Sequence, residues 1–365
     1  MATIELRQVE KKFGDFHAVK PMDLTIHDQE FVVLLGPSGC GKTTTLRMIA
    51  GLETVTGGTI LLNGEDITWK LARERDIAMV FQLFALYPHM TVWQNIAFPL
   101  EAQGMPRAKV RQRVNEVMRT LGIESMRNLR PGALSGGDQQ RVALARSLVR
   151  HPAAFLMDEP IGALDADLRA SMRAEIKRFH LSQGATTVYV THDQVEAMAM
   201  GDRIVVMSEA VVQQIGTPAD VYYNPVNLFV ANFIGSPGMN LVRCRYIGGS
   251  VYLPGGNTYQ IPAEWRAGLS RALTGEEAIL GFRPEAAIIS EQGQVRAEVY
   301  SSDLHGAYTM LHLAIDGPEE MIHVRSDRTV SYPIGATIRV DLITDMVRFF
   351  DPHTEAAINL EVRRV

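Results

Sequence analysis

The segment Gly36-Pro-Ser-Gly-Cys-Gly-Lys-Thr-Thr44 follows the apolar run Phe31–Leu35 and precedes residues that can form a helix. It matches the pattern G-x-x-x-x-G-K-S/T, in which glycines let the backbone turn so that its N–H groups point at phosphate oxygens. In this pattern Lys42 reaches the terminal phosphates and the Thr43 hydroxyl binds Mg²⁺. A glycine-rich turn without a ligand is the alternative. The order of strand, loop, Lys-Thr and helix favours a site for a nucleoside triphosphate.

Length and composition set the broad class of the chain. Its 365 residues suffice for two domains or three, and its 46% apolar and 21% charged residues are typical of a globular protein. The formal net charge of −5 weighs against general binding of nucleic acid. Without a signal peptide or an apolar stretch of about 18 residues, we expect a cytosolic protein that reaches a membrane only through partners. The two cysteines make no disulfide framework.

A pair of acidic residues follows the apolar run Ala153–Met157. In a protein with a phosphate-binding loop, an acidic residue at the end of such a strand, here Asp158, organises Mg²⁺. Glu159 beside it is placed to polarise an attacking water. A capping role for Asp158 is the alternative, and the preceding buried strand favours the catalytic interpretation.

Two further apolar runs end in polar groups. Gln82 follows Ile77–Phe81, and His192 follows Thr187–Thr191. Ligands of open α/β sheets bind at the carboxyl ends of the strands, so Gln82 could reach Mg²⁺ there. By itself, each residue would be a solvated or hydrogen-bonded side chain.

The segment Leu134-Ser-Gly-Gly-Asp-Gln-Gln-Arg141 opens a second helix with an anion-binding start. Ser135 is a good N-cap residue, and two glycines expose the backbone N–H groups behind it. The phosphate-binding loop Gly36–Thr44 (the P-loop) already provides a site for the phosphates. By itself, this second segment is therefore more simply interpreted as a capped helix start.

The rest of the chain divides by pattern. Residues 3–35 show short strands, residues 91–150 show apolar spacing typical of helices, and residues 236–365 show many short strands separated by Gly and Pro. The last pattern suggests a small β-barrel. We interpret the basic face around Lys109 and Arg111 as solvated surface.

These motifs, in this order and spacing, resemble the ATP-binding cassette (ABC) family over about residues 3–235. The matching elements are Phe13, the P-loop, Gln82, Leu134–Gly137, Asp158–Glu159, Asp165 and His192. In that family two cassettes pair head to tail, so that the Leu-Ser-Gly-Gly signature of one closes on the ATP bound by the other. The resemblance therefore implies a homodimer, or pairing with a second ATPase.

The resemblance also assigns roles. It implies that Phe13 stacks on adenine with Val19 beside it, and that Mg²⁺ is held by Thr43, Gln82 and Asp158. It implies catalysis by Glu159 as general base, with His192, Lys42 and Gln82. The phosphates would be held by Gly36, Pro37, Ser38, Gly39, Cys40, Gly41, Lys42, Thr43 and Thr44. The nucleotide of the paired chain would meet Ser135, Gly136, Gly137 and Asp165.

The C-terminal region resembles the regulatory domain of the maltose-importer-type ATPases, through Phe229–Asn240, Gly281–Glu285 and Phe350–Pro352. We therefore expect an α/β P-loop ATPase, an ABC cassette in residues 1–235 with a helical subdomain at about 88–150, followed by an all-β, OB-like barrel in residues 236–365.

This resemblance implies a peripheral ATPase at the cytoplasmic face of the membrane, binding ATP and Mg²⁺ and energising uptake of a sugar, polyol or glycerol-type solute. Its partners would be two permeases, contacted through residues 82–99, an extracytoplasmic solute-binding protein acting indirectly, and a regulatory protein at the barrel. One alternative is an importer for a polyamine, metal or inorganic anion. A soluble, non-transport ABC ATPase acting on nucleic acid is less expected, because such chains usually carry two cassettes.

The sequence departs from the family pattern at several positions. Asp138 stands where the signature usually continues with Gln, and His305 stands where we expect Gly. Asp138 adds a negative charge near the facing phosphates, so we expect its replacement by Gln to raise ATPase activity or leave it unchanged.

Overall fold

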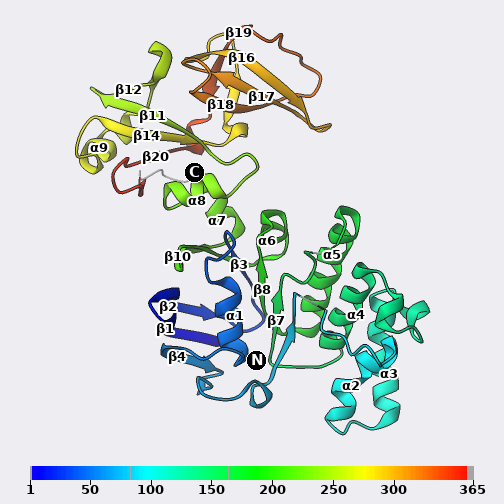
Figure 1. The fold of residues 1–365 in the computed structure, drawn as a ribbon. Coiled ribbons are helices and arrows are strands. Elements are labelled where there is room, and N and C mark those ends of the chain that lie inside the picture. Colours follow the sequence, from blue (N-terminus) through cyan, green and yellow to red (C-terminus); the bar gives the residue numbers. More distant parts are fainter. Residues whose placement is uncertain (1, 83, 163, 360–365) are drawn as a thin grey trace. The chain divides into compact units, whose positions relative to one another are not determined.

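The computed structural model describes residues 2–82, 84–162 and 164–359. The contacts divide the chain into two compact units, one ending at Pro218 and the other beginning at Ala219 (Figure 1). The boundary that the sequence suggested at residue 235 stays a prediction.

A four-stranded antiparallel sheet lies at the start of the first unit. Its order is β2 (Phe16–Ile26), β1 (Ile4–Phe13), β4 (Gly57–Leu62) and β5 (Glu65–Asp66). In β1 the buried residues Ile4 and Leu6 alternate with more exposed ones, as a sheet with one covered face requires. The tight turn between β1 and β2 passes through Gly14, whose φ is 58°.

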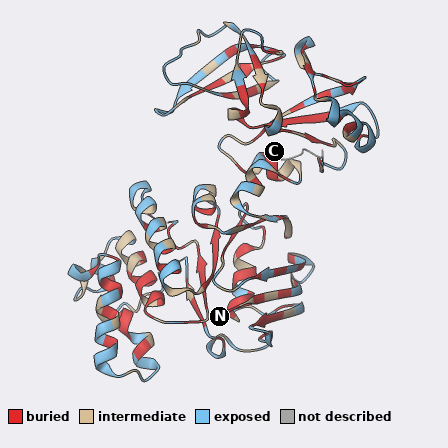
Figure 2. Ribbon diagram, turned by 180° about the vertical axis from the view of Figure 1, so that it is seen from behind, coloured by how far each residue is buried: buried red, intermediate tan, exposed pale blue. Residues whose placement is uncertain are grey.

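The second sheet of this unit forms its centre. Its order is β10 (Val211–Gly216), β9 (Arg203–Ser208), β3 (Phe31–Leu35), β8 (Thr186–Thr191), β7 (Ala154–Asp158) and β6 (Ile77–Val80). All neighbours except β9 and β10 pair in parallel. Strands β3, β7 and β8 are buried throughout (Figure 2). This burial explains the apolar sequence of β3 and of β7 up to Met157, whereas β8 buries threonines together with apolar residues. The carboxyl ends of the parallel strands therefore meet at one edge.

Helices surround this sheet and extend from it. They are α1 (Lys42–Ala50), α2 (Val92–Ala102), α3 (Arg107–Thr120), α4 (Gly136–Leu148), α5 (Ala166–Gln183) and α6 (Gln194–Met200). The apolar spacing predicted α3, and its residues Val110, Val114 and Val117 are buried. Lys109 and Arg111 are exposed, as the solvated-face interpretation expects. Among the described residues, no helix is long and apolar enough to cross a bilayer.

Up to residue 359, where the description ends, the second unit contains two sheets. The first has the order β13 (Thr258–Gln260), β12 (Ser250–Tyr252), β11 (Asn240–Ile247), β14 (Glu277–Phe282), β20 (Val347–Phe350) and β21 (Ala357–Ile358). The second has the order β15 (Ala287–Ile289), β19 (Thr337–Leu342), β16 (Val295–Leu304), β17 (Thr309–Ala314) and β18 (Met321–Ser326).

The two sheets share one apolar core, to which Val242 and Leu280 belong from the first sheet and Val299 and Leu311 from the second. The sequence pattern of this region indicated only strands, so α9 (Ala263–Ala272), which buries Trp265 and Leu269, was not predicted. In the described part of the chain, the remaining short helices are α7 (Pro218–Tyr223) and α8 (Leu228–Phe233), with 3₁₀ turns at Ala72–Glu74, Glu124–Met126, Pro131–Ala133, Pro254–Gly256, Pro284–Ala286 and Thr344–Met346.

Arg283, from the motif Gly281–Glu285, ties the short helices to the barrel sheets. Its side chain is 1% exposed, and its guanidinium donates hydrogen bonds to the backbone carbonyls of Tyr222, Ala231 and Ile234. The Tyr222 hydroxyl in turn donates to Glu285 Oε1 over 2.8 Å. A buried guanidinium is tolerated because several of its N–H groups have acceptors.

Candidate functional site

The P-loop is shaped by close backbone contacts between β3 and α1. A Cβ atom on Gly36 would lie 2.2 Å from the carbonyl oxygen of Met207, and one on Gly41 would lie 2.5 Å from that of Ala18. Gly41 also caps α1 with a φ of 103°, which side-chain-bearing residues rarely adopt. Only glycine fits at these two positions, so the sequence pattern follows from the geometry of the loop.

Lys42 is folded back onto the loop that carries it. Its side chain is 5% exposed, and its ammonium donates hydrogen bonds to the carbonyl oxygens of Gly36 (2.8 Å) and Pro37 (2.9 Å). Cys40 is 3% exposed, with its Sγ 3.7 Å from the same ammonium. The positive charge of Lys42 is therefore fixed at the centre of the loop.

Thr43 and Asp158 join the P-loop to the end of β7. The Thr43 hydroxyl donates to Asp158 Oδ1 over 2.9 Å, and Asp158 is 2% exposed. Burial raises the pKa of this carboxyl, and it outweighs the opposing effects of the Thr43 hydrogen bond and of Arg47. The arrangement of hydroxyl and buried carboxylate suits a hard cation with oxygen ligands.

The Glu159 side chain contacts polar side chains that follow two other strands of the sheet. Its Oε1 lies 3.2 Å from Nδ1 of His192, and its Oε2 accepts from Nε2 of Gln82 over 3.3 Å. Its own backbone has a φ of 45°, unusual for a residue with a side chain, and its N–H donates to the carbonyl of Val190. Strands β6, β7 and β8 thus place one polar group each at this edge of the sheet.

The two predicted adenine contacts differ in their surroundings. The Phe13 side chain is 49% exposed, and the Lys11 ammonium lies 4.8 Å from its ring centroid. Val19 is fully buried in β2, on the side of the P-loop where Gly41 packs. The structure therefore leaves the Phe13 ring open to a ligand, whereas Val19 supports the loop from beneath.

The signature segment lies elsewhere in the first unit. Ser135 caps α4, and Ser135, Gly136 and Asp165 are exposed. Asp165 caps α5 by accepting from the backbone N–H of Leu168 over 2.9 Å. Figure 1 shows α4 well separated from α1, with β7 and β8 between them. Within one chain, the structure does not bring these residues to the P-loop.

A buried hydrogen-bond network next to His192 was not predicted from the sequence. Glu196 is 2% exposed, and its Oε2 accepts from the hydroxyls of Tyr189 (2.8 Å) and Thr191 (2.7 Å). Thr191 also accepts the backbone N–H of Asp193 over 2.9 Å, which fixes the turn carrying His192. The available signal was the spacing of Asp193 and Glu196, N-cap and third residue of α6.

A second missed residue, Arg146 of α4, holds the segment after Gln82. Its guanidinium donates to the carbonyls of Ala85 (2.7 Å) and Phe84 (3.2 Å) and lies 5.5 Å from the Tyr87 ring. The helix that begins with the signature is therefore in direct contact with residues 84–87.

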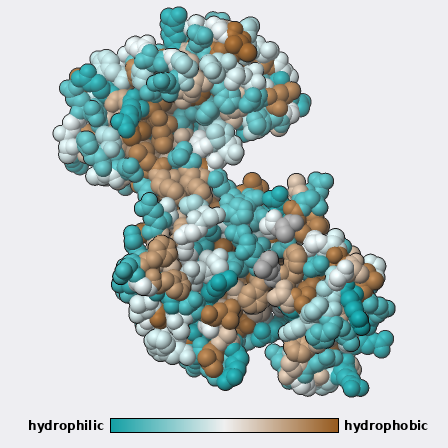
Figure 3. Space-filling view, in the orientation of Figure 1, coloured by the Kyte–Doolittle hydropathy of each residue, from teal (hydrophilic) through white to brown (hydrophobic). Residues whose placement is uncertain are grey.

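Figure 3 shows apolar residues on the surface of the first unit, and the large exposed ones include Phe81 and Phe98.

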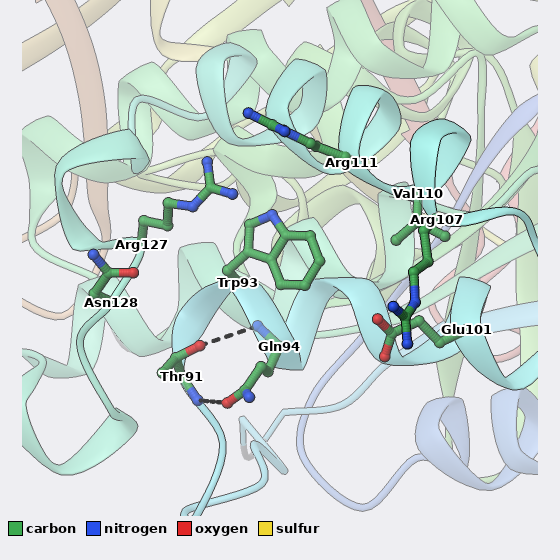
Figure 4. A pocket seen from close by; sticks show the side chains of 9 residues that line it. All are labelled: Thr91, Trp93, Gln94, Glu101, Arg107, Val110, Arg111, Arg127 and Asn128. Carbon is green, nitrogen blue, oxygen red and sulfur yellow. Dashed lines mark hydrogen bonds between the residues drawn. The ribbon is translucent and has the colours of Figure 1, made fainter.

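A cavity of about 630 Å³ lies in the helical part of the unit, lined by residues of α2 and α3 (Figure 4). Trp93 stands between the arginines of this cavity, and the Arg127 guanidinium lies 5.5 Å from its ring centroid. None of the predicted catalytic residues lines this cavity. The cavity is therefore separate from the predicted catalytic residues.

Together, the strand–loop–helix unit, the buried carboxylate at the end of β7 and the three strand-end side chains define a P-loop ATPase. Comparison with known proteins specifies the family. The ABC transporter family model matches residues 19–162, and the MalK OB fold domain model matches residues 235–287.

Full-length relatives agree with these matches. An uncharacterized ABC transporter ATP-binding protein of Bacillus subtilis, YurJ, is 44% identical over 368 residues, covering 98% of this chain and 100% of the relative. The trehalose import ATP-binding protein SugC of Mycobacterium tuberculosis is 48% identical over 328 residues, covering 87% of this chain and 83% of the relative. The chain belongs to the ABC transporter ATP-binding family, and it is an ATPase.

A solved structure matches the cassette. A dimeric ATP-binding cassette bound to ADP and Pi, in a post-hydrolysis state, has a TM-score of 0.54 and 33% identity, covering 59% of this chain and 98% of its own. The predicted ABC cassette with an OB-like C-terminal domain is confirmed.

Proposed function

We propose that this chain is the ATP-hydrolysing subunit of an importer and that it works as a head-to-tail pair. The observation that carries the pairing is the position of the signature: Ser135 and Gly136 are exposed at the start of α4, away from the P-loop of their own chain. A helix start with free N–H groups is an anion site. A second chain, related by two-fold symmetry, would complete each ATP site with this helix start.

In this proposal the P-loop and the strand-end residues have different roles in ATP hydrolysis. The P-loop amides and Lys42 hold the phosphates, and Glu159 takes the proton of the attacking water. His192 and Gln82 now both contact Glu159, so binding of ATP would redistribute these contacts toward the γ-phosphate and the water.

Thr43, Asp158 and Gln82 would hold Mg²⁺, which neutralises charge on the phosphates. The fit rests on the buried Asp158 carboxylate, whose pKa is raised by burial. Such a carboxylate gains a countercharge when a cation binds beside it.

We assign the cargo to the class of sugars, polyols or glycerol-type solutes. This assignment is supported by the 48% identity to a relative named for trehalose import and by the MalK-type C-terminal domain. Residues 82–99 would contact two permeases, from the cytoplasmic face of the membrane, and transmit closure of the pair. We also propose, on the same resemblance, that the chain could pair with a different ATPase and that a regulatory protein binds the C-terminal barrel.

The test is to purify the tagged chain from its native membranes in mild detergent and to identify its partners. We expect two multi-span permeases and a solute-binding protein that releases a carbohydrate. A matched variant, Phe98→Ala, removes an exposed ring of the proposed contact segment and should lose the permeases while keeping ATP binding. Release of a polyamine, metal or inorganic anion would change the cargo class. Recovery of soluble partners alone would contradict the transport function.

A further inference from the structure

The signature of this chain contains a carboxylate that engages the signature serine. The Ser135 hydroxyl donates to Asp138 Oδ2 over 2.8 Å, while its oxygen accepts the backbone N–H of Asp138 over 3.2 Å. The other carboxylate oxygen, Oδ1, is paired with Arg141 one turn further along α4. Both oxygens of Asp138 are therefore occupied, each by a different partner.

This hydrogen-bonding pattern determines what Ser135 can offer to a ligand. A serine hydroxyl has one proton to donate, and here the proton goes to Asp138. A phosphate approaching from a second chain would meet the lone pairs of Ser135 and, close by, a carboxylate with a side-chain exposure of 20%. Two negative groups at that spacing repel each other.

The Arg141 guanidinium can bind the Asp138 carboxylate in a second arrangement. Its Nη2 already bonds to Asp138, whereas its Nε is buried and has no hydrogen-bond partner among the residues that the structure describes. Nε and Nη2 form one side of the guanidinium fork, the side that binds a carboxylate through two parallel hydrogen bonds. A small rotation of the Asp138 side chain away from Ser135 would satisfy the unpartnered Nε.

We propose that Asp138 is a positioning residue that acts as a latch on Ser135, with Arg141 as the receiving partner. In the open chain the Ser135 hydroxyl donates its hydrogen bond to the Asp138 carboxylate. On closure, the Asp138 carboxylate instead binds both Nε and Nη2 of Arg141. The Ser135 hydroxyl then donates its hydrogen bond to the γ-phosphate of the ATP that the partner chain binds. This inference rests on the head-to-tail pair proposed above, and it makes closure dependent on a step that the usual Gln would not require.

The charge state of Asp138 supports a closed latch at neutral pH. Burial acts to raise the pKa of its carboxyl, but the Ser135 hydrogen bond and the Arg141 guanidinium outweigh it, so the pKa lies below its usual value. The carboxylate is thus ionised and remains an acceptor for the serine proton. Simple helix capping is the competing explanation, since an acidic residue in the first turn also stabilises a helix.

The test measures the ATP concentration needed to occlude nucleotide in the full chain carrying Glu159→Gln. Asp138→Asn in that background should lower this concentration by about tenfold, the scale of one charge-assisted hydrogen bond. Arg141→Met should raise it, because the carboxylate then loses its second position. Glu175→Gln is the control, since Glu175 pairs with Arg178 at the same i, i+3 spacing on α5, over 3.0 Å, and should change nothing.

A second comparison separates a latch from a cap. The gain from Asp138→Asn should vanish when Ser135→Ala is also present, because the latch acts through that hydroxyl. If Ser135→Ala prevents occlusion altogether, the direction of the Arg141→Met effect decides the question.

The outcomes distinguish the latch from the proposed function. If the Glu159→Gln parent occludes no ATP, the head-to-tail function itself fails. If the parent occludes ATP but Asp138→Asn requires the same or a higher concentration, the latch is overturned while the proposed function stands. A gain that persists in Ser135→Ala, or an Arg141→Met variant that closes as readily as the parent, also overturns it.

Discussion

Nδ1 of His192 lies 3.2 Å from Oε1 of Glu159, so the ends of β8 and β7 are linked through their side chains. Gln82 approaches the second oxygen of the same carboxylate from the end of β6. In this state the proposed general base is engaged on both oxygens. Because a base must be free to accept a proton from water, binding of ATP and closure of a pair have to change these contacts before hydrolysis begins.

Replacing Glu159 by Gln removes the base while leaving the P-loop untouched. We expect turnover of ATP to fall by at least about a hundredfold, with ATP affinity close to that of the unmodified chain. Lys42→Ala serves as the contrasting variant, because it should weaken nucleotide binding itself. Steady-state hydrolysis and equilibrium binding measure the two quantities. Hydrolysis at the unmodified rate in Glu159→Gln would remove Glu159 from its proposed role.

Asp158→Asn should stabilise the nucleotide-free chain and abolish Mg²⁺-dependent hydrolysis. Burial raises the pKa of Asp158 in the folded state, so ionisation of this carboxyl opposes folding. The protonated Asp158 carboxyl therefore contributes stability that is fully present below the ordinary pKa. This contribution is lost as the pH rises through the raised pKa of the folded state. We expect a higher melting temperature for the variant at neutral pH and a smaller difference in acid.

Asp66 provides the control of opposite sign. Its pKa is lowered by the hydroxyl and backbone N–H of Thr68, so Asp66→Asn should not raise the melting temperature. Thermal unfolding without nucleotide, at several pH values, makes the comparison. A melting temperature for Asp158→Asn that is lower at neutral pH would contradict this account.

Glu196→Ala tests whether the buried network positions His192. The variant removes the acceptor of two buried hydroxyls, those of Tyr189 and Thr191, and each unsatisfied group costs about 1–3 kcal/mol. We expect kcat to fall while the affinity for ATP changes little, and Glu196→Gln should recover part of kcat. Val195→Ala, at a neighbouring position that is 61% exposed, is the control. Equal losses in ATP affinity and kcat would indicate a general structural role instead.

Arg146→Met tests the link between the signature helix and residues 84–87. Loss of its bonds to the carbonyls of Ala85 and Phe84 should leave ATP binding by the chain unchanged. Hydrolysis that depends on assembled permeases should fall severalfold. Arg119→Met removes an exposed arginine of the same part of the fold and should have no effect. Full permease-dependent hydrolysis in Arg146→Met would show that the link carries no coupling.

Much of the central sheet could be predicted, because β3 and β7 are apolar runs, β8 is rich in β-branched residues, and polar residues stand at the strand ends. That pattern follows directly from burial on both faces and ligand binding at one edge. The two glycines with crowded Cβ positions, Gly36 and Gly41, likewise leave a recognisable sequence signal.

Other features could not be predicted, since they depend on contacts between distant residues. The hydrogen-bond partners of Arg146 lie 61 and 62 positions away along the chain, and those of Arg283 lie 49–61 positions away. Helix α9 was missed because its two buried residues, Trp265 and Leu269, give a weak helical period beside glycines and prolines. Burial of Val19 is also invisible in sequence, because a β-strand valine can face either side.

The most direct test of the head-to-tail pair mixes two defective chains, both carrying Glu159→Gln. One also carries Lys42→Ala and the other also carries Ser135→Arg, so each alone has only defective sites. In a mixed pair, one site combines an intact P-loop with an intact signature from the other chain. We predict that neither chain alone occludes ATP and that the mixture occludes one ATP for each mixed pair. If the mixture occludes none while the Glu159→Gln parent does, or if Ser135→Arg alone occludes ATP like the parent, the signature does not complete the site of a second chain.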